Sequence, residues 1–421
     1  MNMPRLSPGM MARYEIEDHR PGRVDAVQFG CGETLLGVVD RLLDAAGVGI
    51  ACVSGGDETR LLKEQEGLYT LLIRGYDGDE AVKREQVVQC ILEVTEDIGP
   101  LTADPEIRLC IVDDTDDARA RFGAFRAARA AAGLPEAAAL ILGENLLADG
   151  LAFRAEPDEA AKQCREMNYL DGMLHLTEPG ARLTLCAPGL SLPRVPGVTQ
   201  TDPDGLALEK TLKRRVFDAG LSLMAAPGWL NGCDTLSDCM KHDRLRKFLG
   251  ETFTRELLPM LNGLPREAVE ARVIESFGRY EDPLNRNRLL RAVGDPLDWF
   301  ITDGVPMMRA WAYENFEPPR GMAFALAAAI MLLAGARMDP KSNRYEVARG
   351  RLTEPLEGDP ERLALFATLS HDMPPEALAY AVLADRELWG ADLRDIDGLE
   401  ARVTLDIAGI QREPGYLPGG D

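Results

Sequence analysis

The N-terminal half of the chain alternates between two hydrophobic patterns. Short, nearly continuous apolar runs predict β-strands at residues 24–29, 48–54, 69–75, 107–114 and 137–145. In the intervening segments the apolar positions recur at helical spacing, which predicts helices at residues 38–47, 80–93 and 117–132. Strands that alternate with helices are typical of crossover connections on a mostly parallel sheet. We therefore expect an N-terminal α/β domain of the nucleotide-binding type.

Helical spacing dominates the chain after about residue 205. It predicts helices at residues 210–226, 234–262, 265–279, 284–293, 305–315 and 320–336. The preceding segment, 176–206, is rich in Pro, Gly and Thr and has few helix formers, so we expect it to connect the two parts. The pattern therefore predicts two domains, an α/β domain over 1–205 and a mainly α-helical domain over 206–421.

Composition and charge narrow the class of protein. A chain of 421 residues suits two domains. Its 47 Lys and Arg against 69 Asp and Glu give a net charge of −22, which argues against a nucleic-acid surface and against docking on anionic membranes. The N-terminus lacks the apolar segment of a secretory signal, and the apolar run 322–336 is shorter than the ~20 residues that span a bilayer. Because the eight cysteines are also widely spread, we expect a reduced, cytoplasmic, soluble protein.

A glycine turn stands between the first predicted strand and the first predicted helix. Gly30, Gly32 and Gly37 would let the backbone approach a pyrophosphate, whose charge the helix N-terminus would attract. The third glycine of a G-x-G-x-x-G fingerprint would fall at position 35, which is Leu35. A cofactor turn and an ordinary strand–helix turn therefore both remain open on this motif alone.

Several further stretches share one resemblance. The opening Phe29-Gly30-Cys31-Gly32, continued by Leu35 and Val39-Asp40, is similar to F-G-x-G-N-F-x-R-A-F-V-D of the long-chain mannitol dehydrogenases. Other stretches that resemble family patterns follow in order. With the family's pattern in parentheses, they are 65–75 (Q-x-G-L-Y-T-x-L-L-R-G), 114–118 (N-T-T-E-A), 144–150 (D-N-x-x-x-N-G), 279–289 (R-F-x-N-P-x-x-x-H-x-L) and 388–393 (L-W-G-x-x-L). The chain thus resembles the mannitol dehydrogenase family from about residue 24 to 410, and most of all its tagaturonate reductase, or altronate oxidoreductase, branch.

The resemblance implies a fold, a cofactor and a reaction. It implies a Rossmann-like domain, a helical substrate domain and a metal-independent, NAD(P)-dependent oxidoreductase. The reaction would interconvert a sugar alcohol or sugar acid (polyol or hexuronate) and its keto form. The cofactor-binding residues would be Gly30, Cys31, Gly32, Glu33 and Thr115. The branch favours NAD, but Ser54-Gly55-Gly56 lacks the acid that usually holds the ribose, so NADP remains open.

The family's catalytic residues are kept in part. Oxidation of a secondary alcohol needs a base and donors that hold the oxyanion. Lys213 matches the lysine of K-x-x-x-x-N-x-x-H and would be the base, and Asn145 matches an oxyanion donor. Spacings of five and eight are expected to bring such helical residues to roughly one face. Asp218 replaces the motif's asparagine and Leu221 its histidine, and an ion pair between Asp218 and Lys213 would make the lysine a poorer base.

Other departures keep two alternatives open. Relative to the family, Glu33 and Leu36 change the pyrophosphate loop, Asn287 replaces a histidine, and Trp299 and Asp303 replace a lysine and an arginine. These changes fit a catalytically impaired homologue that binds ligand or assembles, or an enzyme with a neutral or cationic substrate.

Two further clusters contain side chains that can bind ligands. The acidic run 113–117 reads as a cofactor-side loop, a cation site or a solvated turn, and the spacing of Cys239 and His242 fits no zinc pattern, so we expect no metal. The expected partner is a small sugar-derived molecule, and the expected state is a monomer or homodimer.

Overall fold

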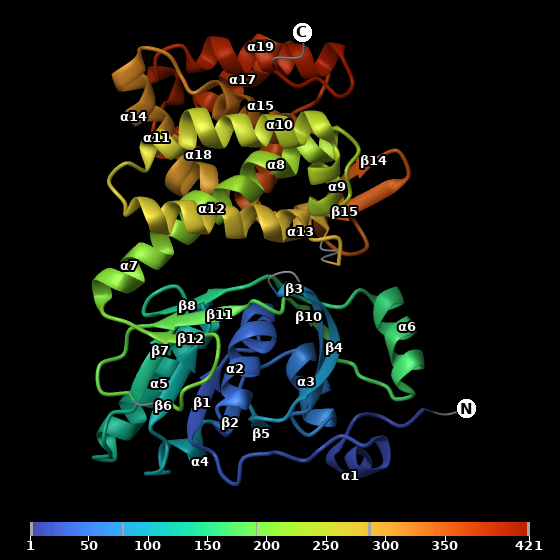
Figure 1. The fold of residues 1–421 in the computed structure, drawn as a ribbon, viewed down its shortest axis with the longest axis vertical. Coiled ribbons are helices and arrows are strands. Elements are labelled where there is room, and N and C mark those ends of the chain that lie inside the picture. Colours follow the sequence, from blue (N-terminus) through green and yellow to red (C-terminus); the bar gives the residue numbers. More distant parts are fainter. Residues whose placement is uncertain (1–2, 78–79, 191, 285–287, 419–421) are drawn as a thin grey trace. The chain divides into compact units, whose positions relative to one another are not determined.

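The computed structural model describes residues 3–77, 80–190, 192–284 and 288–418. The chain divides into two compact units, Met1–Glu209 and Lys210–Asp421. The helices and strands of each unit are labelled in Figure 1.

A five-stranded parallel sheet forms the centre of the first unit. Its order is β5-β2-β1-β6-β7, and every neighbouring pair is parallel. The strands are β1 (Ala26–Phe29), β2 (Ile50–Val53), β5 (Ile91–Thr95), β6 (Leu109–Val112) and β7 (Ala138–Ile141). Every residue of β1, β2 and β6 is buried, which explains their continuous apolar runs. This order is that of a Rossmann sheet, in which the strand order reverses between β1 and β6.

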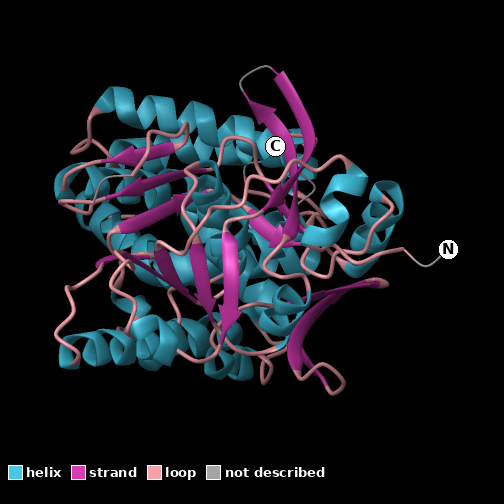
Figure 2. Ribbon diagram, turned by 90° about the horizontal axis from the view of Figure 1, so that it is seen from below, coloured by secondary structure: helices cyan, strands magenta, loops and turns pink. Residues whose placement is uncertain are grey.

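Helices cover both faces of this sheet (Figure 2). A π-helical turn, η2 (Leu35–Val39), continues into α2 (Asp40–Ala45), and its apolar side chains pack with Ala26 of β1. On the opposite face, α5 (Asp116–Ala131) packs Phe122 and Phe125 against Phe29. The predicted helix at 117–132 and the mostly parallel sheet are thus confirmed.

The predicted helix at 80–93 is wrong. This segment forms β4 (Glu80–Val88) and then β5, and β4 pairs antiparallel with β3 (Tyr69–Asp77) over its whole length. The pair belongs to a second sheet of order β4-β3-β10-β9, so β3 is not a strand of the parallel sheet. Hydrogen bonding to β3 overrides the weak helical spacing, because strand preference depends on the partner strand more than on local sequence.

The rest of the first unit is built from short elements. They are α1 (Pro8–Met11), η1 (Ala12–Tyr14), α3 (Asp57–Glu64), α4 (Gly99–Thr102), β8 (Leu146–Asp149), β9 (Ala152–Arg154), α6 (Pro157–Met167), β10 (His175–Thr177), β11 (Arg182–Leu185) and β12 (Val198–Gln200). The segment 176–206, expected to be a plain connection, therefore supplies strands to the sheet β12-β11-β8 and to the second sheet. Pro and Gly mark its turns and do not exclude short strands.

The second unit is mainly helical, as predicted. Its helices are η3 (Lys213–Asp218), α8 (Ala219–Leu230), α9 (Leu236–Lys241), α10 (Asp243–Thr252), η4 (Phe253–Leu257), α11 (Leu258–Met260), α12 (Arg266–Glu281), α13 (Leu289–Val293), η5 (Phe300–Gly304), α14 (Val305–Asn315), α15 (Arg320–Leu333), α16 (Pro360–Phe366), α17 (Pro375–Leu383), α18 (Arg386–Trp389), η6 (Leu393–Asp395) and α19 (Leu399–Arg412). The helix α7 (Pro203–Leu212) leads into η3.

The centre of the second unit is α15, which is buried from Gly321 to Leu333 and packs against α8 and α19. None of the described helices is long and apolar enough to cross a membrane. A small sheet, β13 (Arg337–Asp339), β14 (Arg344–Arg349) and β15 (Leu352–Pro355), was not predicted.

Candidate functional site

The glycine turn lies where the strand order of the parallel sheet reverses. Residues 30–32 follow β1, and residues 113–115 follow the neighbouring strand β6. In open sheets of this order, dinucleotides bind outside the carboxyl ends of the strands at this switch point. The two motifs that the sequence placed 80 residues apart therefore meet at the edge of the sheet where a cofactor is expected.

Asp113 is the residue that packs into the glycine turn. Its Oδ2 accepts a hydrogen bond from Gly32 N (3.0 Å), and its Oδ1 accepts one from Asp114 N (3.0 Å). A Cβ on Gly30 would lie 2.6 Å from Asp113 Cβ, and one on Gly32 would lie 2.5 Å from Asp113 Oδ2. Gly30 also has a φ of +102°, which side chains rarely adopt. Both glycines are therefore required by the turn itself, and burial raises the pKa of Asp113.

The other predicted cofactor residues are also engaged within the first unit. The Sγ of Cys31 lies 3.4 Å from Ser54 Oγ, which follows β2. Burial raises the pKa of the Cys31 thiol. Glu33 Oε1 accepts a hydrogen bond from Arg154 N of β9 (2.9 Å). Thr115 caps α5, since its Oγ1 accepts a hydrogen bond from Ala118 N.

The acidic run 113–117 is a helix-capping turn with paired carboxylates. Asp114 forms an ion pair with Arg119, and Asp117 forms one with Arg121. No group of three or more His, Cys, Asp or Glu among the described residues could hold a metal ion. His242, weighed with Cys239 as a metal pair, instead caps α10 by accepting a hydrogen bond from Leu245 N.

Asn145 ties the turn after β7 to that strand. Its Oδ1 accepts a hydrogen bond from Ile141 N (2.7 Å), and its Nδ2 donates one to Ala139 O (2.7 Å). An amide nitrogen carries two hydrogens, so one remains for another acceptor. The predicted role of Asn145 as an oxyanion donor stays a prediction.

In the second unit, Lys213 and Asp218 form a close ion pair. Lys213 Nζ lies 2.8 Å from Asp218 Oδ1 and 3.0 Å from Oδ2, and both side chains are largely buried, with exposed fractions of 23% and 16%. The two residues are the ends of η3, in which Ala219 N donates to Arg214 O, five residues earlier. The ion pair expected from the sequence is present.

The pair depends on the π-helical geometry of η3. In an α-helix, residues five apart lie about 140° apart around the axis, because each residue turns it by about 100°. A π-helical turn closes its hydrogen bonds at i→i+5 and so stacks such residues on one side. Lys213 and Asp218 therefore lie together because the turn is π-helical. The spacing of an α-helix would not bring residues five apart to one face.

The substituted residues Trp299 and Asp303 contact the same turn. Trp299 Nε1 donates to Arg214 O (3.0 Å), and Asp303 Oδ2 accepts from Arg214 Nε (3.0 Å). Asp303 also lies 3.5 Å from Arg215. Two arginines thus compensate the negative charge of Asp303. This weakens the expectation that Asp303 attracts a cationic substrate. Asn287, another substituted position, lies outside the described residues.

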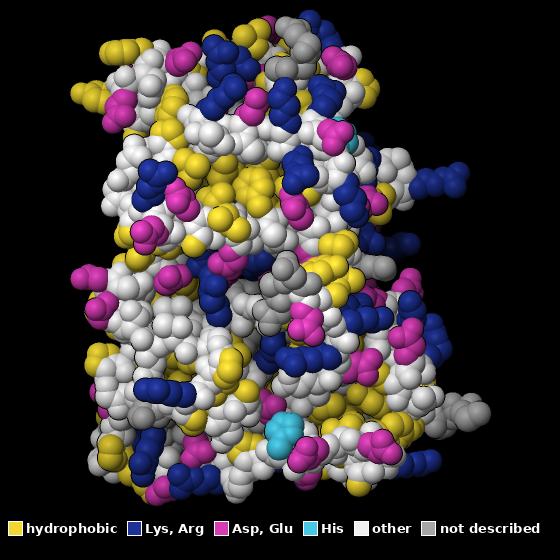
Figure 3. Space-filling view, viewed as in Figure 1, with side chains coloured by type: hydrophobic (Ala, Val, Ile, Leu, Met, Phe, Trp, Pro, Cys, Tyr) yellow, Lys and Arg dark blue, Asp and Glu magenta, His cyan; other side chains and the backbone are white. Residues whose placement is uncertain are grey.

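Charges on the surface are mixed. On the face shown in Figure 3, the described Lys and Arg side chains are interspersed with Asp and Glu rather than gathered into a basic tract.

Leu36 and Leu221, which replace an arginine and a histidine of the family motifs, are both buried, at 0% and 4% exposed.

Comparison with solved structures defines the class of fold. The chain matches the mannitol 2-dehydrogenase of Pseudomonas fluorescens, solved as a ternary complex with NAD and D-mannitol, with a TM-score of 0.76 and 16% identity over 98% of this chain and 97% of that one. It matches a D-sorbitol dehydrogenase, solved in substrate-free form, with a TM-score of 0.66 and 16% identity over 98% and 99% of the two chains. The chain therefore has the mannitol dehydrogenase fold.

Sequence relatives narrow this class. The chain is 25% identical over 276 residues to the altronate oxidoreductase of Klebsiella pneumoniae (strain 342). The matched region covers 63% of this chain and 54% of the relative. The chain is 24% identical, over the same shares, to that of Escherichia coli O7:K1. The chain thus spans about half the length of these curated relatives, and no family model matches it. These relationships confirm the resemblance to the mannitol dehydrogenase family and to its altronate oxidoreductase branch.

Proposed function

We propose that this protein is an NAD-dependent oxidoreductase that interconverts a sugar alcohol or sugar acid and its keto form. The observation that carries the proposal is the glycine turn at the switch point of a Rossmann-ordered sheet. The altronate oxidoreductase relatives and the mannitol 2-dehydrogenase fold, which was solved with NAD, support it.

The backbone of the first unit fits a dinucleotide. Gly30 adopts a positive φ, and the helical segment that includes η2 starts directly after the turn, so its N-terminus faces the switch point. The Glu33 carboxylate is held by Arg154 N of β9, which donates to its Oε1. When bound, NAD supplies the hydride acceptor or donor. We assign Gly30, Cys31, Gly32, Glu33 and Thr115 to the cofactor side.

We assign the proton transfer to Lys213. In the reduction direction its ammonium Nζ would donate a proton to the keto oxygen, and in the oxidation direction the neutral amine would accept the hydroxyl proton. The carboxylate of Asp218 lies 2.8 Å from this Nζ and holds it in an ion pair. Asn145 would donate the remaining hydrogen of its Nδ2 to the carbonyl oxygen.

The proposal extends to the substrate and the setting of the protein. Altronate- or tagaturonate-like sugar acids come first among the substrates to test, because the relatives are altronate oxidoreductases, and polyols come second. We also propose a cytoplasmic location and a monomer or homodimer.

A titration of NADH fluorescence, with NADPH in parallel, tests the proposal. We expect saturable NADH binding in the micromolar range, followed by NADH oxidation in the presence of a keto sugar acid. The Gly32→Ala variant should lose NADH binding, because its Cβ would overlap Asp113 Oδ2. The Gly123→Ala variant in α5 should keep it, because nothing lies within 4 Å of that Cβ. No binding of either cofactor up to millimolar concentration would refute the proposal and favour a catalytically impaired homologue.

A further inference from the structure

Two buried side chains hold the π-helical turn from outside its own helix. Tyr280 Oη donates a hydrogen bond to Phe217 O (2.6 Å), and Trp299 Nε1 donates one to Arg214 O (3.0 Å). Tyr280 is 0% exposed and Trp299 is 2% exposed. Both acceptors are main-chain carbonyls of η3, the turn that begins at Lys213 and ends at Asp218.

These bonds matter because a π-helical turn is rarely stable by itself. Isolated π turns occur mostly as single insertions in α-helices, often at functional sites. Arg214 O also accepts a hydrogen bond from Ala219 N within the turn, so Trp299 supplies it with a second donor, and Tyr280 supplies a donor to Phe217 O. A buried donor that loses its acceptor is costly, so both bonds oppose a movement of these carbonyls. The two donors therefore hold the main chain of η3 in its π-helical geometry.

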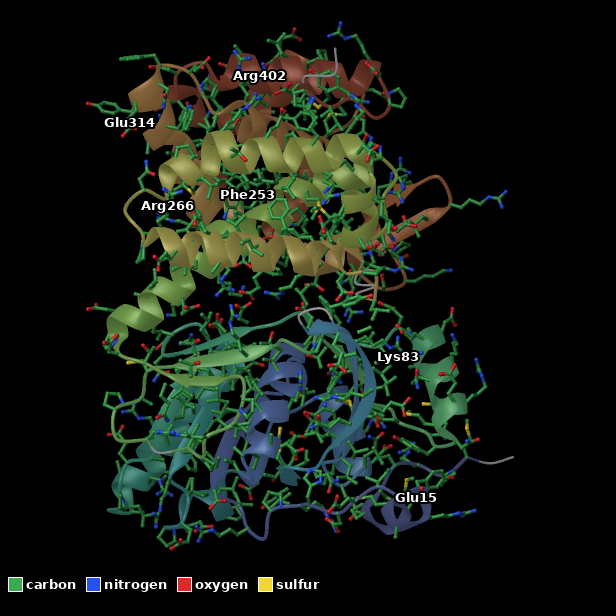
Figure 4. All side chains as sticks on the ribbon, in the orientation of Figure 1. Glu15, Lys83, Phe253, Arg266, Glu314 and Arg402 are labelled. Carbon is green, nitrogen blue, oxygen red and sulfur yellow. The ribbon has the colours of Figure 1, made fainter. Side chains whose placement is uncertain are left out.

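Tyr280 is itself fixed by aromatic packing. Its ring stacks on Phe217 at 5.4 Å and lies 5.9 Å from Phe277, which in turn contacts Phe253 at 5.2 Å. Figure 4 shows Phe253 pointing between α10 and α12. The Arg279 guanidinium covers the Phe217 ring at 3.7 Å. The hydroxyl is thus presented to the turn from a rigid base.

Gly220, one turn further on, leaves the space that the hydroxyl occupies. A Cβ at this position would lie 2.3 Å from Tyr280 Oη. The approach of Tyr280 to the backbone therefore depends on the absence of a side chain at Gly220.

We propose that Tyr280 and Trp299 are positioning residues, which keep Lys213 and Asp218 in contact by fixing the π-helical turn between them. The inference rests on the proposed function only for its catalytic consequence. If the turn relaxed to a regular α-helix, the ammonium and the carboxylate would lie about 140° apart around the axis and the pair would separate. Because burial raises the pKa of Tyr280 well above its usual range, its hydroxyl remains a donor at every working pH.

Chemical labelling of Lys213 tests the geometry without using activity. The full-length protein is treated with an amine-acylating reagent over a range of pH, and the modification of Lys213 is followed by peptide mass spectrometry. While Nζ is held by the Asp218 carboxylate it is shielded from the reagent, so loss of this contact speeds the labelling of Lys213. We expect Tyr280→Phe, which removes only the hydroxyl, to speed labelling of Lys213 about fivefold, the change expected from the loss of one hydrogen bond.

The controls separate this effect from general loosening. Tyr380→Phe makes the same chemical change at a tyrosine that is 53% exposed, and it should leave the labelling of Lys213 unchanged. Trp299→Phe removes the other donor and should act in the same direction as Tyr280→Phe, so it decides the question if Tyr280→Phe does not fold. In the active enzyme both variants should also change kcat while changing KM little.

The outcomes distinguish the inference from the proposed function. Equal labelling of Lys213 in wild type, Tyr280→Phe and Trp299→Phe would overturn the inference even if the protein is an active oxidoreductase. Absence of oxidoreductase activity in the wild type would refute the proposed function, while faster labelling in both variants would still support the positioning role.

Discussion

Lys213 Nζ and the two carboxylate oxygens of Asp218 lie 2.8 and 3.0 Å apart across one π-helical turn. The contact joins the residue that matches the family's catalytic lysine to a residue that departs from the family's asparagine. The lysine that the family motif retains and the aspartate that departs from it therefore form one ion pair. Substitutions at either residue test its role.

The first experiment restores the family's residue. In Asp218→Asn the carboxylate is replaced by a neutral amide, so Lys213 Nζ loses the ion-pair partner that holds it and is freed to contact the substrate oxygen. We expect a several-fold rise in the NADH-dependent reduction rate. Asp298→Asn, which neutralises an exposed partner of Arg214, should change the rate much less. Equal reduction rates for wild type and Asp218→Asn would count against the coupling.

The second experiment removes the proposed proton carrier. Lys213→Met keeps the length of the side chain and removes the charge. We expect kcat to fall by about 10²–10⁴-fold, which is the usual contribution of a positioned acid or base. The affinity for NADH should be unchanged in this variant. A decrease of less than threefold in kcat would assign the proton transfer to another group.

A third experiment measures the space at Gly220. Gly→Ala inside a helix ordinarily stabilises a protein by about 0.4–1 kcal/mol. Gly220→Ala should instead lower the melting temperature, because its Cβ would lie 2.3 Å from Tyr280 Oη. Gly250→Ala in α10 is the matched control, since nothing lies within 4 Å of its Cβ, and it should raise the melting temperature slightly. A stabilising Gly220→Ala would show that Tyr280 can move away at little cost.

A fourth experiment concerns a buried acid beneath the glycine turn. Asp40 is fully buried between Gln28 and Tyr69, and burial raises its pKa from 3.8 to about 8. Between pH 4 and pH 8 the folded protein therefore holds a proton at Asp40 that the unfolded chain has lost. Its contribution to stability falls as pH rises through this window, with a slope of up to about 1.4 kcal/mol per pH unit.

Urea denaturation at pH 5 and pH 8 measures this effect. Asp40→Asn is neutral at both pH values, so its stability relative to the wild type should be greater at pH 8 than at pH 5. Asp57→Asn, whose carboxylate is 88% exposed, should show no such difference. If the difference between Asp40→Asn and wild type is the same at both pH values, Asp40 does not carry the extra proton.

The sequence by itself determined the parallel sheet, the helical second unit and several element boundaries. Strands buried on both faces need continuous apolar runs, and α14 and α15 have the spacing of helices that bury one face or all faces. The order of short motifs along the chain was also enough to find the family. These features are encoded in neighbouring residues, so they can be seen before any tertiary structure is known.

Tertiary structure alone decided the rest. Residues 80–88 became a strand because β3 pairs with them, and the glycines of the turn are required by Asp113, which lies 81 residues beyond Gly32. The π-helical turn depends on Tyr280, 63 residues from Phe217, a contact without a local signal in the sequence. Local pattern fixes the periodicity of a segment, whereas donors and partners brought from distant parts of the chain decide which of its possible geometries is adopted.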